Sequence, residues 1–559
     1  MELLQMGIVI VVLLLLVKPV GTYMFHVFSN EPNRTDKVFG STENVIFKII
    51  GLRNRDSMNW KKYVLSFIAT NAVLIAISYL LLRFQGILPG NPNGNENMEA
   101  SLALNTIISF MTNTNLQHYS GESGVTYLTQ MAFVTMMMFT SAASGAAIAV
   151  AFIRGITRRG DGLGNFFQDF TKAIIRIFLP LALIVTIVLV GLKVPQTFDP
   201  TATVTTLEGV EQQITMGPIA SLEAIKHLGT NGGGFFGANS SHPFENPSPL
   251  TNVIEILSMW VLAASLPYMF GLFAKNKKQG WVIFSSMMIL FLIFLSISYS
   301  SEKAGNPAIN SLGIESSQGS MEGKEVRFGI AQSALFSTVT TAATTGSVNN
   351  MHDTLTPLGG LAALSEMMLN VVFGGKGVGL VNMLMYAILG VFICGLMVGR
   401  TPEFLGRKIE AREMKMIALV ILVHPFIILV PTALSFMTAS GYDSISNPGF
   451  HGLTQSLYEY TSSAANNGSG FEGLADNNVF WNVSTGLVMF FGRYMSIIAM
   501  LAVAGSLNAK KPVAETIGTF RTDNKLFIGI LIGVVLLIGA LTFLPVIVLG
   551  PVAEFLTLH

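Results

Sequence analysis

The sequence is poor in charged residues and contains a single cysteine. Charged residues make up 12% of the 559 positions, hydrophobic residues make up 51%, and mean hydropathy is +0.57. A soluble chain carries about 25% charged residues, so the composition predicts an integral membrane protein. Cys394 lies in an apolar run, which excludes a disulfide framework and a cysteine-based metal site. The net charge of +1 gives no indication of a nucleic-acid partner.

The motifs of a nucleotide-dependent enzyme are also absent. The sequence has no Walker A motif and no Asp-Lys-Thr phosphorylation motif, so we expect no ATP hydrolysis by this chain. Gly232, Gly234 and Gly237 match the dinucleotide fingerprint, but no strand precedes them and an apolar run follows, so we reject that interpretation. No organic cofactor is expected. The histidines of the outer loops have no common ligand spacing, so the only metal ion we expect is a transported one. These histidines are His118, His242, His352 and His451.

A short polar turn occurs four times between apolar runs. Its most conspicuous copy is the glycine-rich stretch from Gly229 to Gly237. The four turns align on Asn115, Gly232, Gly346 and Gly468, at intervals of 117, 114 and 122 residues. Glycine adopts positive φ freely and Asn tolerates it. Turns of this kind around one axis present rings of carbonyl oxygens that replace the hydration shell of a monovalent cation. The sequence therefore predicts a cation pore.

We call residues 112–115, 229–232, 343–346 and 465–468 the filter loops, and they form the predicted selectivity filter for a monovalent cation. Its residues are Thr112, Asn113, Thr114, Asn115, Gly229, Thr230, Asn231, Gly232, Ala343, Thr344, Thr345, Gly346, Ala465, Asn466, Asn467 and Gly468. Gln117, Gly233 and Gly234 flank it, and Gln117 is expected to tune affinity less severely than Gly232.

The apolar runs predict an all-α polytopic membrane protein of about ten spans. Four pseudo-repeats of helix, pore loop and helix surround a central pore, and one extra transmembrane helix stands at each end. Each pore loop contains a short helical segment too brief to cross a bilayer, so it must line a shared internal cavity. Ordinary outer loops are the alternative, and four recurrences disfavour it. The expected divisions are an N-terminal helix at 1–29, a cytoplasmic loop at 30–62, pore repeats at 63–153, 154–274, 275–399 and 400–507, and a cytoplasmic loop with a C-terminal helix at 508–559.

Lysine and arginine set the orientation. Twenty-four of the 33 fall in five loops on one side of the predicted membrane, at 30–62, 153–176, 272–280, 400–415 and 508–525. Short basic loops stay in the cytoplasm. Both termini and all four filter loops are therefore expected to be extracytoplasmic.

Carboxylates follow the four turns closely. With few basic residues nearby, they are expected to make the mouth of the pore negative and to concentrate cations. The equally favoured alternative is that they solvate the outer loops, and Glu245 could instead brace its own loop. These residues are Glu122, Glu245, Asp353 and Glu472.

Two features are predicted to block straight passage below the filter. The stretch 374–379 interrupts the second helix of repeat 3 and would break it into two halves joined by a linker. Its gate residues are Gly374, Gly375, Lys376 and Gly377. Arg493 lies in the middle of a span, where a charge is usually functional. We expect the linker to lie across the pore and Arg493 to add an electrostatic barrier. The alternative is that Arg493 braces helix C-termini or a carboxylate such as Glu366.

The chain resembles a family on the residues of these motifs. Gly229 to Phe236, His242-Pro243-Phe244-Glu245-Asn246-Pro247 and Ala464 to Gly468, together with Thr112 to Asn115 and Gln117, are similar to the potassium-binding subunit of the bacterial Kdp complex. The resemblance covers essentially the whole chain and extends to the superfamily of potassium transporters. Gly237 departs from the expected pattern, beyond the filter.

The resemblance implies a K⁺-selective subunit of an ATP-driven uptake pump in the bacterial plasma (inner) membrane. It implies three partners in a hetero-oligomeric complex: a P-type ATPase subunit that hydrolyses ATP, a periplasmic-facing accessory subunit and a small single-span subunit. An autonomous potassium channel or ion-coupled symporter on the same plan is the alternative. A membrane enzyme or scaffold is disfavoured because no nucleophile, base or metal constellation is present.

Overall fold

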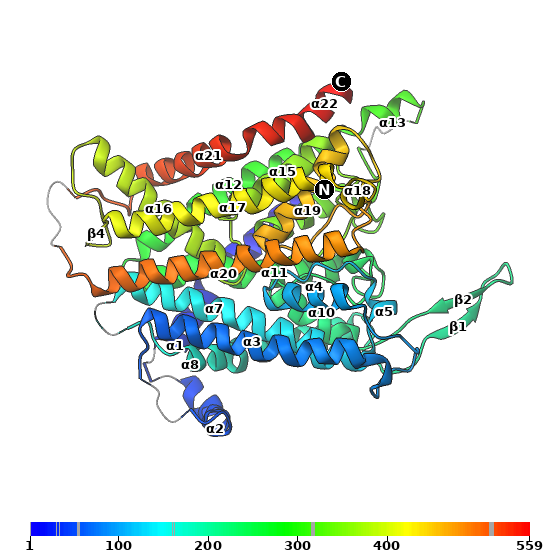
Figure 1. Cartoon of the computed structure of the whole chain (residues 1–559), viewed down its shortest axis with the longest axis horizontal. Coiled ribbons are helices and arrows are strands. Elements are labelled where there is room, and N and C mark those ends of the chain that lie inside the picture. Colours follow the sequence, from blue (N-terminus) through cyan, green and yellow to red (C-terminus); the bar gives the residue numbers. More distant parts are fainter. Residues whose placement is uncertain are drawn as a thin grey trace.

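The computed structural model consists almost entirely of helices that run nearly parallel to the long axis of the molecule (Figure 1). It describes residues 2–29, 31–32, 34–52, 56–158, 160, 162–314, 319–513 and 519–558. Arg53, Arg55 and Arg159 of the basic loops lie outside these ranges. Within the described ranges ten helical stretches are long and apolar enough to cross a membrane. The prediction of an all-α polytopic protein with about ten spans is confirmed.

Each repeat has the predicted order of a long helix, a short pore helix, a filter loop and a second long helix. Repeat 1 contains α3 (Trp60–Phe84), η1 (Gln85–Ile87), the pore helix α4 (Ala100–Met111), α5 (Gly121–Gly124), α6 (Tyr127–Thr129), η2 (Gln130–Thr135) and α7 (Met136–Thr157). Repeat 2 contains α8 (Phe166–Lys172), η3 (Ala173–Phe178), α9 (Leu179–Gly191), the hairpin strands β1 (Ala202–Thr205) and β2 (Glu211–Ile214), the pore helix α10 (Ile219–Leu228), η4 (Asn239–Ser241) and α11 (Pro249–Phe273).

Repeats 3 and 4 follow the same order. Repeat 3 contains α12 (Lys277–Ala304), α13 (Pro307–Ser311), the pore helix α14 (Gly329–Ala342), α15 (Pro357–Leu369) and α16 (Val378–Met397). Repeat 4 contains α17 (Ala411–Met437), α18 (Ala439–Tyr442), the pore helix α19 (Phe450–Ala465) and α20 (Val479–Ala509), preceded by the short strands β3 (Glu403–Phe404) and β4 (Arg407–Lys408). Outside the repeats lie α1 (Glu2–Phe28), α2 (Arg34–Ile49), α21 (Lys525–Ile547), η5 (Val548–Val552) and α22 (Ala553–Leu558).

Burial separates the second helices of the repeats from the peripheral spans. In the spans that contain α7 and α11, 89% and 83% of the residues in the most apolar 18-residue stretch are buried. In the spans that contain α1 and α3, only 22% of the residues in the corresponding stretch are buried. A helix buried on all sides must be apolar all round, and one that faces lipid needs only a stripe of contacts. The second helices therefore form the wall around the filter loops, and α1, α3, α9, α17 and α21 lie outside them.

The structure differs from the sequence prediction in three elements. The break in the second helix of repeat 3 begins at Asn370, four residues before the glycine run, because Asn370 has a left-handed backbone that ends α15. The stretch 30–62 contains a helix, α2, and repeat 2 carries the hairpin β1–β2, which pairs Ala202 with Ile214. The stretch 30–62 was predicted only as a cytoplasmic loop, and no element was predicted between 194 and 217.

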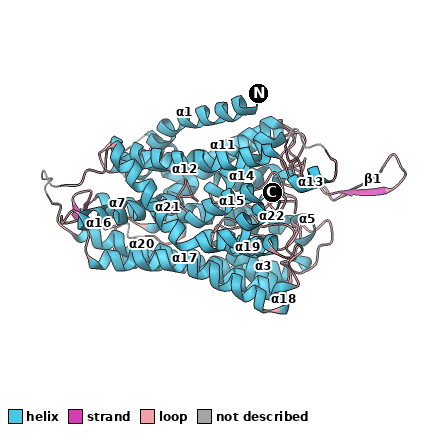
Figure 2. Cartoon of the chain, turned by 90° about the horizontal axis from the view of Figure 1, so that it is seen from above, coloured by secondary structure: helices cyan, strands magenta, loops and turns pink. Residues whose placement is uncertain are grey.

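The two ends of the helix bundle differ in what they carry. The N-terminal end of α1 and the C-terminal helix α22 lie at the end that also carries α5, α13 and the hairpin β1–β2 (Figure 1). Seen from above, the hairpin again projects from this end (Figure 2). Strands β3 and β4, in the basic loop 400–415, lie at the opposite end (Figure 1). The molecule therefore keeps both termini away from that basic loop.

Candidate functional site

The four filter loops share one backbone conformation. Their second residues all have positive φ, namely 63° at Asn113, 47° at Thr230, 45° at Thr344 and 55° at Asn466. Their fourth residues also have positive φ, namely 56° at Asn115, 88° at Gly232, 83° at Gly346 and 104° at Gly468. Because the intervening residues are absent from the positive-φ set, the sign of φ alternates along each loop. Successive peptide groups therefore have the same orientations in all four loops.

The loops touch one another in a closed ring. A Cβ placed on Gly232 would lie 2.1 Å from the carbonyl oxygen of Thr345 in the next loop. A Cβ on Gly346 would likewise lie 2.2 Å from the Asn467 carbonyl oxygen, and a Cβ on Gly468 would lie 1.9 Å from the Thr114 carbonyl oxygen. The Asn113 side chain closes the ring by donating to the Thr230 carbonyl at 2.6 Å. At these three glycines any side chain would collide with the neighbouring backbone.

The carbonyl groups at the third position of each loop have no donor. They belong to Thr114, Asn231, Thr345 and Asn467, all of which are fully buried. Among the described residues no backbone N–H or side chain donates to any of these four oxygens. Because buried carbonyls are nearly always paired, four equivalent unpaired oxygens in one ring indicate a site for a cation.

The pore helices add to the negative potential at the ring. Helices α4, α10, α14 and α19 each end at, or one residue before, the first residue of a filter loop. The C-terminus of a helix carries about half a negative charge. Four such ends converging on the loops favour a bound cation.

The repeat-1 loop departs from the other three at Asn115. This side chain is fully buried, and neither its Oδ1 nor its Nδ2 has a hydrogen-bond partner among the described residues. The side-chain oxygen of the neighbouring Asn113, by contrast, accepts two hydrogen bonds, from Ser141 and Asn231 at 2.8 Å each. The ring is therefore asymmetric at one of its four corners.

Comparisons with known proteins assign this architecture. The family model for the potassium-transporting ATPase A subunit matches residues 7–556. The chain belongs to this family. A curated relative from Geobacillus kaustophilus, named the potassium-transporting ATPase potassium-binding subunit, is 60% identical over 555 residues, 99% of each chain. The crystal structure of the potassium transporter TrkH from Vibrio parahaemolyticus has the same fold, with a TM-score of 0.52 at 15% identity, over 88% of this chain and 96% of that one.

In this member of the family, Gln117 joins filter loop 1 to the backbone after loop 2. Its Oε1 accepts from the Gly234 N–H at 2.8 Å, and its Nε2 donates to the Gly234 carbonyl and to the Tyr119 hydroxyl at 3.2 Å each. Gly233 leaves room for this contact, because a Cβ there would meet the Asn115 oxygen at 3.0 Å. The flanking residues thus fix the spacing between loops 1 and 2.

The predicted mouth carboxylates do not all face the mouth. Glu245 is fully buried, forms an ion pair with Lys226 at 2.7 Å and accepts from the Phe236 N–H at 2.8 Å. The prediction that it attracts cations at the mouth is not supported, because its carboxylate is buried and contacts the Lys226 ammonium, and it braces its own loop instead. Glu472 is exposed and lines a cavity of about 320 Å³ above the filter loops, which we call the vestibule.

The other two carboxylates hold outer loops together. Glu122 accepts from the Gly237 N–H at 2.8 Å. Asp353 accepts from Gln455 at 2.8 Å and lies 3.1 Å from His451. Their roles in attracting cations stay predictions.

The linker between α15 and α16, residues 370–377, packs directly against a filter loop. The Gly375 N–H donates to the carbonyl of Ala343 at 2.8 Å, and a Cβ on Gly375 would lie 3.0 Å from the Thr344 hydroxyl. From there the linker crosses to α7, where Gly145 approaches the Lys376 carbonyl so closely that a Cβ would come within 2.6 Å. The Lys376 ammonium lies 3.4 Å from the carbonyl of Met259 in α11.

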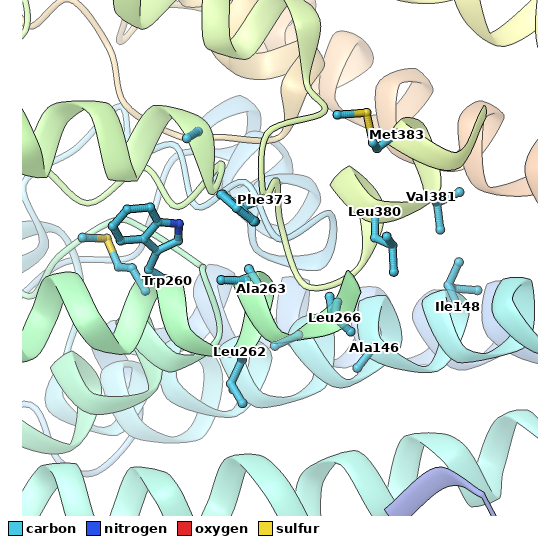
Figure 3. Close-up of a cluster of buried hydrophobic side chains, with 14 of the residues drawn as sticks. Ala146, Ile148, Trp260, Leu262, Ala263, Leu266, Phe373, Leu380, Val381 and Met383 are labelled. Atoms are coloured by element: carbon cyan, nitrogen blue, oxygen red, sulfur yellow. The ribbon is translucent and has the colours of Figure 1, made fainter. Parts of the chain in front are cut away.

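Hydrophobic side chains fix the linker in this position. Phe373 packs between Trp260 of α11 and Phe284 of α12, at ring-centroid distances of 6.0 and 5.4 Å. Figure 3 shows the chain descending from Phe373 past Ala263 and turning back into α16 near Leu380. Sequence analysis missed Asn370, whose side chain faces the Ala465 carbonyl at 3.5 Å and whose backbone starts the break. In the sequence, only the glycines at 374–377 indicated a break in this helix.

Arg493 lies beside the linker without an acidic partner. It is 5% exposed, and its guanidinium lies 3.1 Å from the position of a Cβ on Gly145, next to the Lys376 carbonyl. No described carboxylate forms an ion pair with it. Glu366 instead accepts from the Thr341 hydroxyl at 2.6 Å. The alternative in which Arg493 braces this carboxylate is therefore not supported.

Proposed function

We propose that this chain is the K⁺-selecting, non-catalytic subunit of an ATP-driven potassium pump, and that K⁺ binds in the ring of filter loops. The observation that carries the proposal is the set of four equivalent, buried and unpaired carbonyl oxygens of Thr114, Asn231, Thr345 and Asn467. Such oxygens replace the hydration shell of K⁺. Relatives with this family's name bind potassium, which fits an uncharged ring of oxygens better than it fits a carboxylate cage.

The proposal places the chain in the bacterial plasma membrane with its filter loops and both termini outside the cytoplasm. The basic residues at 30–62 and 400–415 support this orientation, because short basic loops remain cytoplasmic. The vestibule then receives K⁺ from outside the cell.

Transport against a gradient requires that the filter is not continuous with an open pore. The linker crosses from filter loop 3 to α7, and Arg493 places an unpaired positive charge beside it. A unit charge about 4 Å from K⁺ costs roughly 4 kcal/mol at an effective dielectric of 20. We therefore propose that K⁺ is diverted sideways to an ATPase subunit, which hydrolyses ATP. An autonomous channel is disfavoured by the same barrier.

The proposal includes three partners: the ATPase subunit, an accessory subunit that faces the periplasm and a small single-span subunit. Exposed apolar side chains on α9, including Leu183, Ile184 and Ile187, support contact with lipid or with a partner span. Co-purification of the chain from its native membrane, followed by identification of the associated subunits, tests this part.

The decisive experiment measures K⁺ binding directly. Wild-type protein and Gly232→Asp are titrated with K⁺ and with Na⁺ by calorimetry in detergent. Gly232 has φ of 88° and no room for a side chain, so the variant should lose K⁺ binding or its preference over Na⁺. Gly486→Ala is the control, because a Cβ there meets its nearest neighbour at an ordinary 3.7 Å. Wild-type affinity and selectivity in Gly232→Asp would refute the assignment.

A further inference from the structure

A histidine and two carboxylates from three separate segments meet at the wall of the vestibule. His118 follows filter loop 1, Glu459 belongs to the pore helix α19, and Asp476 precedes α20. The His118 Nε2 lies 3.4 Å from the Glu459 Oε1 and 3.7 Å from the Asp476 Oδ2. The ligand atoms of all three residues lie within 4.8 Å of one another.

The hydrogen bond on the other side of the imidazole ring determines which nitrogen faces the carboxylates. The His118 Nδ1 lies 2.7 Å from the Asn482 Oδ1, and the Asn482 Nδ2 contacts the Ser101 hydroxyl at 3.2 Å. With the amide in this orientation, Nδ1 donates its proton and Nε2 faces Glu459 and Asp476. The two carboxylates hold a proton on Nε2 when no cation is bound, and a metal ion would displace that proton. Histidine ligands of metal ions are commonly oriented in this way, by donation from the second nitrogen.

The carboxylate of Glu459 is buried and incompletely paired. Its side chain is 1% exposed, and its Oε2 has no hydrogen-bond partner among the described residues. An unpaired buried carboxylate is costly, and a cation would relieve that cost. Asp476, with a side chain that is 25% exposed, connects this position to the vestibule.

The corresponding position in repeat 2 is already filled by a cation. Glu223 and Glu459 each stand nine residues before the marker glycine of their repeat, Gly232 and Gly468. The Lys226 ammonium lies 2.7 Å from the Glu223 carboxylate, whereas the residue at the position of Lys226 in repeat 4 is Ser462. Repeat 4 therefore has the carboxylate without the built-in ammonium.

We propose that His118, Glu459 and Asp476 form a binding site for a divalent transition-metal ion of the Zn²⁺ class, with a fourth position open to the vestibule. Zinc bonds of about 2.0–2.2 Å in tetrahedral geometry separate neighbouring ligand atoms by roughly 3.3–3.6 Å. The two separations from the His118 Nε2, 3.4 and 3.7 Å, match this spacing closely. One imidazole and two carboxylates suit Zn²⁺ better than Mg²⁺ or Ca²⁺, which prefer oxygen ligands only.

A bound divalent ion here would oppose K⁺ entry. Gln117 and Gly468 line the vestibule together with His118 and Asp476, so the ion would neutralise the two carboxylates beside the entrance to the ring. The negative potential that concentrates K⁺ at the entrance would be lost, and K⁺ occupancy would fall. This consequence rests on the proposed function, whereas the binding of the metal does not.

The test is a titration of the purified chain with Zn²⁺ in competition with a chromophoric chelator. We expect one ion per wild-type chain and an affinity about 10–100-fold lower in His118→Gln and Asp476→Asn. Asp476 is the safer variant for folding because its side chain is partly exposed. Glu472→Gln is the matched control, since it changes a vestibule carboxyl outside the cluster and should keep the wild-type affinity within about twofold.

Cobalt provides an independent readout. Co²⁺ in place of Zn²⁺ should give the visible absorption of a tetrahedral complex in wild type and lose it in Asp476→Asn. Absence of stoichiometric binding, or equal affinity in wild type and both cluster variants, would overturn the site. A His118 imidazole that keeps its proton in the presence of excess Zn²⁺ would overturn it as well. Intact K⁺ binding in the same samples separates failure of this site from failure of the filter.

Discussion

The ring of filter loops and the linker beneath it are both irregular backbone inside the helix bundle, yet they are built in opposite ways. The ring uses four equivalent segments that touch through backbone atoms, as Gly346 touches the Asn467 carbonyl. The linker occurs once, in repeat 3, and contacts different elements along its length, including Ala343 of filter loop 3 and Trp260 of α11. Selection of a spherical ion benefits from equivalent oxygens on all sides, whereas a barrier needs only one segment across the path.

The largest loss of K⁺ affinity should come from filling the ring. Gly346→Ala and Gly468→Ala place a Cβ about 2 Å from a neighbouring carbonyl oxygen and force alanine into positive φ. The left-handed backbone alone costs about 1–2 kcal/mol, so K⁺ affinity should fall at least about tenfold. Equilibrium K⁺ binding measures this. Asn115→Ala is the comparison within the ring, and it should weaken binding less because a side chain already fits there. Equal losses at all three positions would remove the distinction between the corners of the ring.

A second effect should appear only below the ring. Arg493→Gln removes the unpaired charge beside the linker, so K⁺ should leak passively through the reconstituted complex while K⁺ affinity is kept. The barrier of roughly 4 kcal/mol predicts about a thousandfold increase in passive flux. Uptake of a potassium tracer into vesicles without ATP measures it. Lys193→Gln, at an exposed position, is the control. Tight vesicles with the variant would show that the linker alone closes the path.

A third effect on K⁺ affinity should come from loosening the contact between loops 1 and 2, with each loop itself left intact. Gln117→Ala leaves the Gly234 N–H without its acceptor and frees loop 1 from the backbone after loop 2. Loss of one such hydrogen bond is worth about 0.5–1.5 kcal/mol, or roughly two- to tenfold in K⁺ affinity. Calorimetric titration of Gln117→Ala beside Gly468→Ala compares the two. A larger loss in Gln117→Ala would mean that spacing between the loops matters more than their packing.

The outer rim, which is also not repeated, should affect the stability of the protein and leave K⁺ affinity unchanged. His451 contacts Asp353 at 3.1 Å and Glu554 of the C-terminal helix α22 at 2.9 Å. Burial lowers the pKa of His451, but hydrogen bonds to Asp353 and Glu554 outweigh burial and raise it to about 9. Because this pKa lies above the unfolded value of about 6.5, the stabilisation is complete below pH 6.5 and is lost as pH rises through about 9.

His451→Gln should therefore destabilise the protein at pH 6.5 and have little effect near pH 10. Hydrogen bonds to charged groups contribute about 1.5–3 kcal/mol, which sets the upper bound for these two partly exposed contacts. Thermal unfolding of both proteins at the two pH values measures the difference. A destabilisation independent of pH would indicate lost packing against Phe471, on which the His451 ring stacks.

Much of the fold was contained in the sequence by itself. Apolar runs of membrane-spanning length predicted the ten spans, because a bilayer admits only segments that satisfy their own backbone hydrogen bonds. The fourfold turn with its Asn and Gly residues predicted the filter loops, because few residues adopt positive φ. The glycine run from Gly374 to Gly377 predicted the break in repeat 3, although Asn370 begins it.

The tertiary structure alone decided which polar groups face one another. Glu245 and Glu472 both follow a filter loop at close range, yet Glu245 is buried against the Lys226 ammonium and Glu472 reaches the vestibule. His118 and Glu459 are 341 residues apart and meet only because repeats 1 and 4 are neighbours in the ring. A local pattern fixes backbone conformation through φ and hydrophobic period, whereas burial and pairing of charge depend on distant segments that the pattern does not specify.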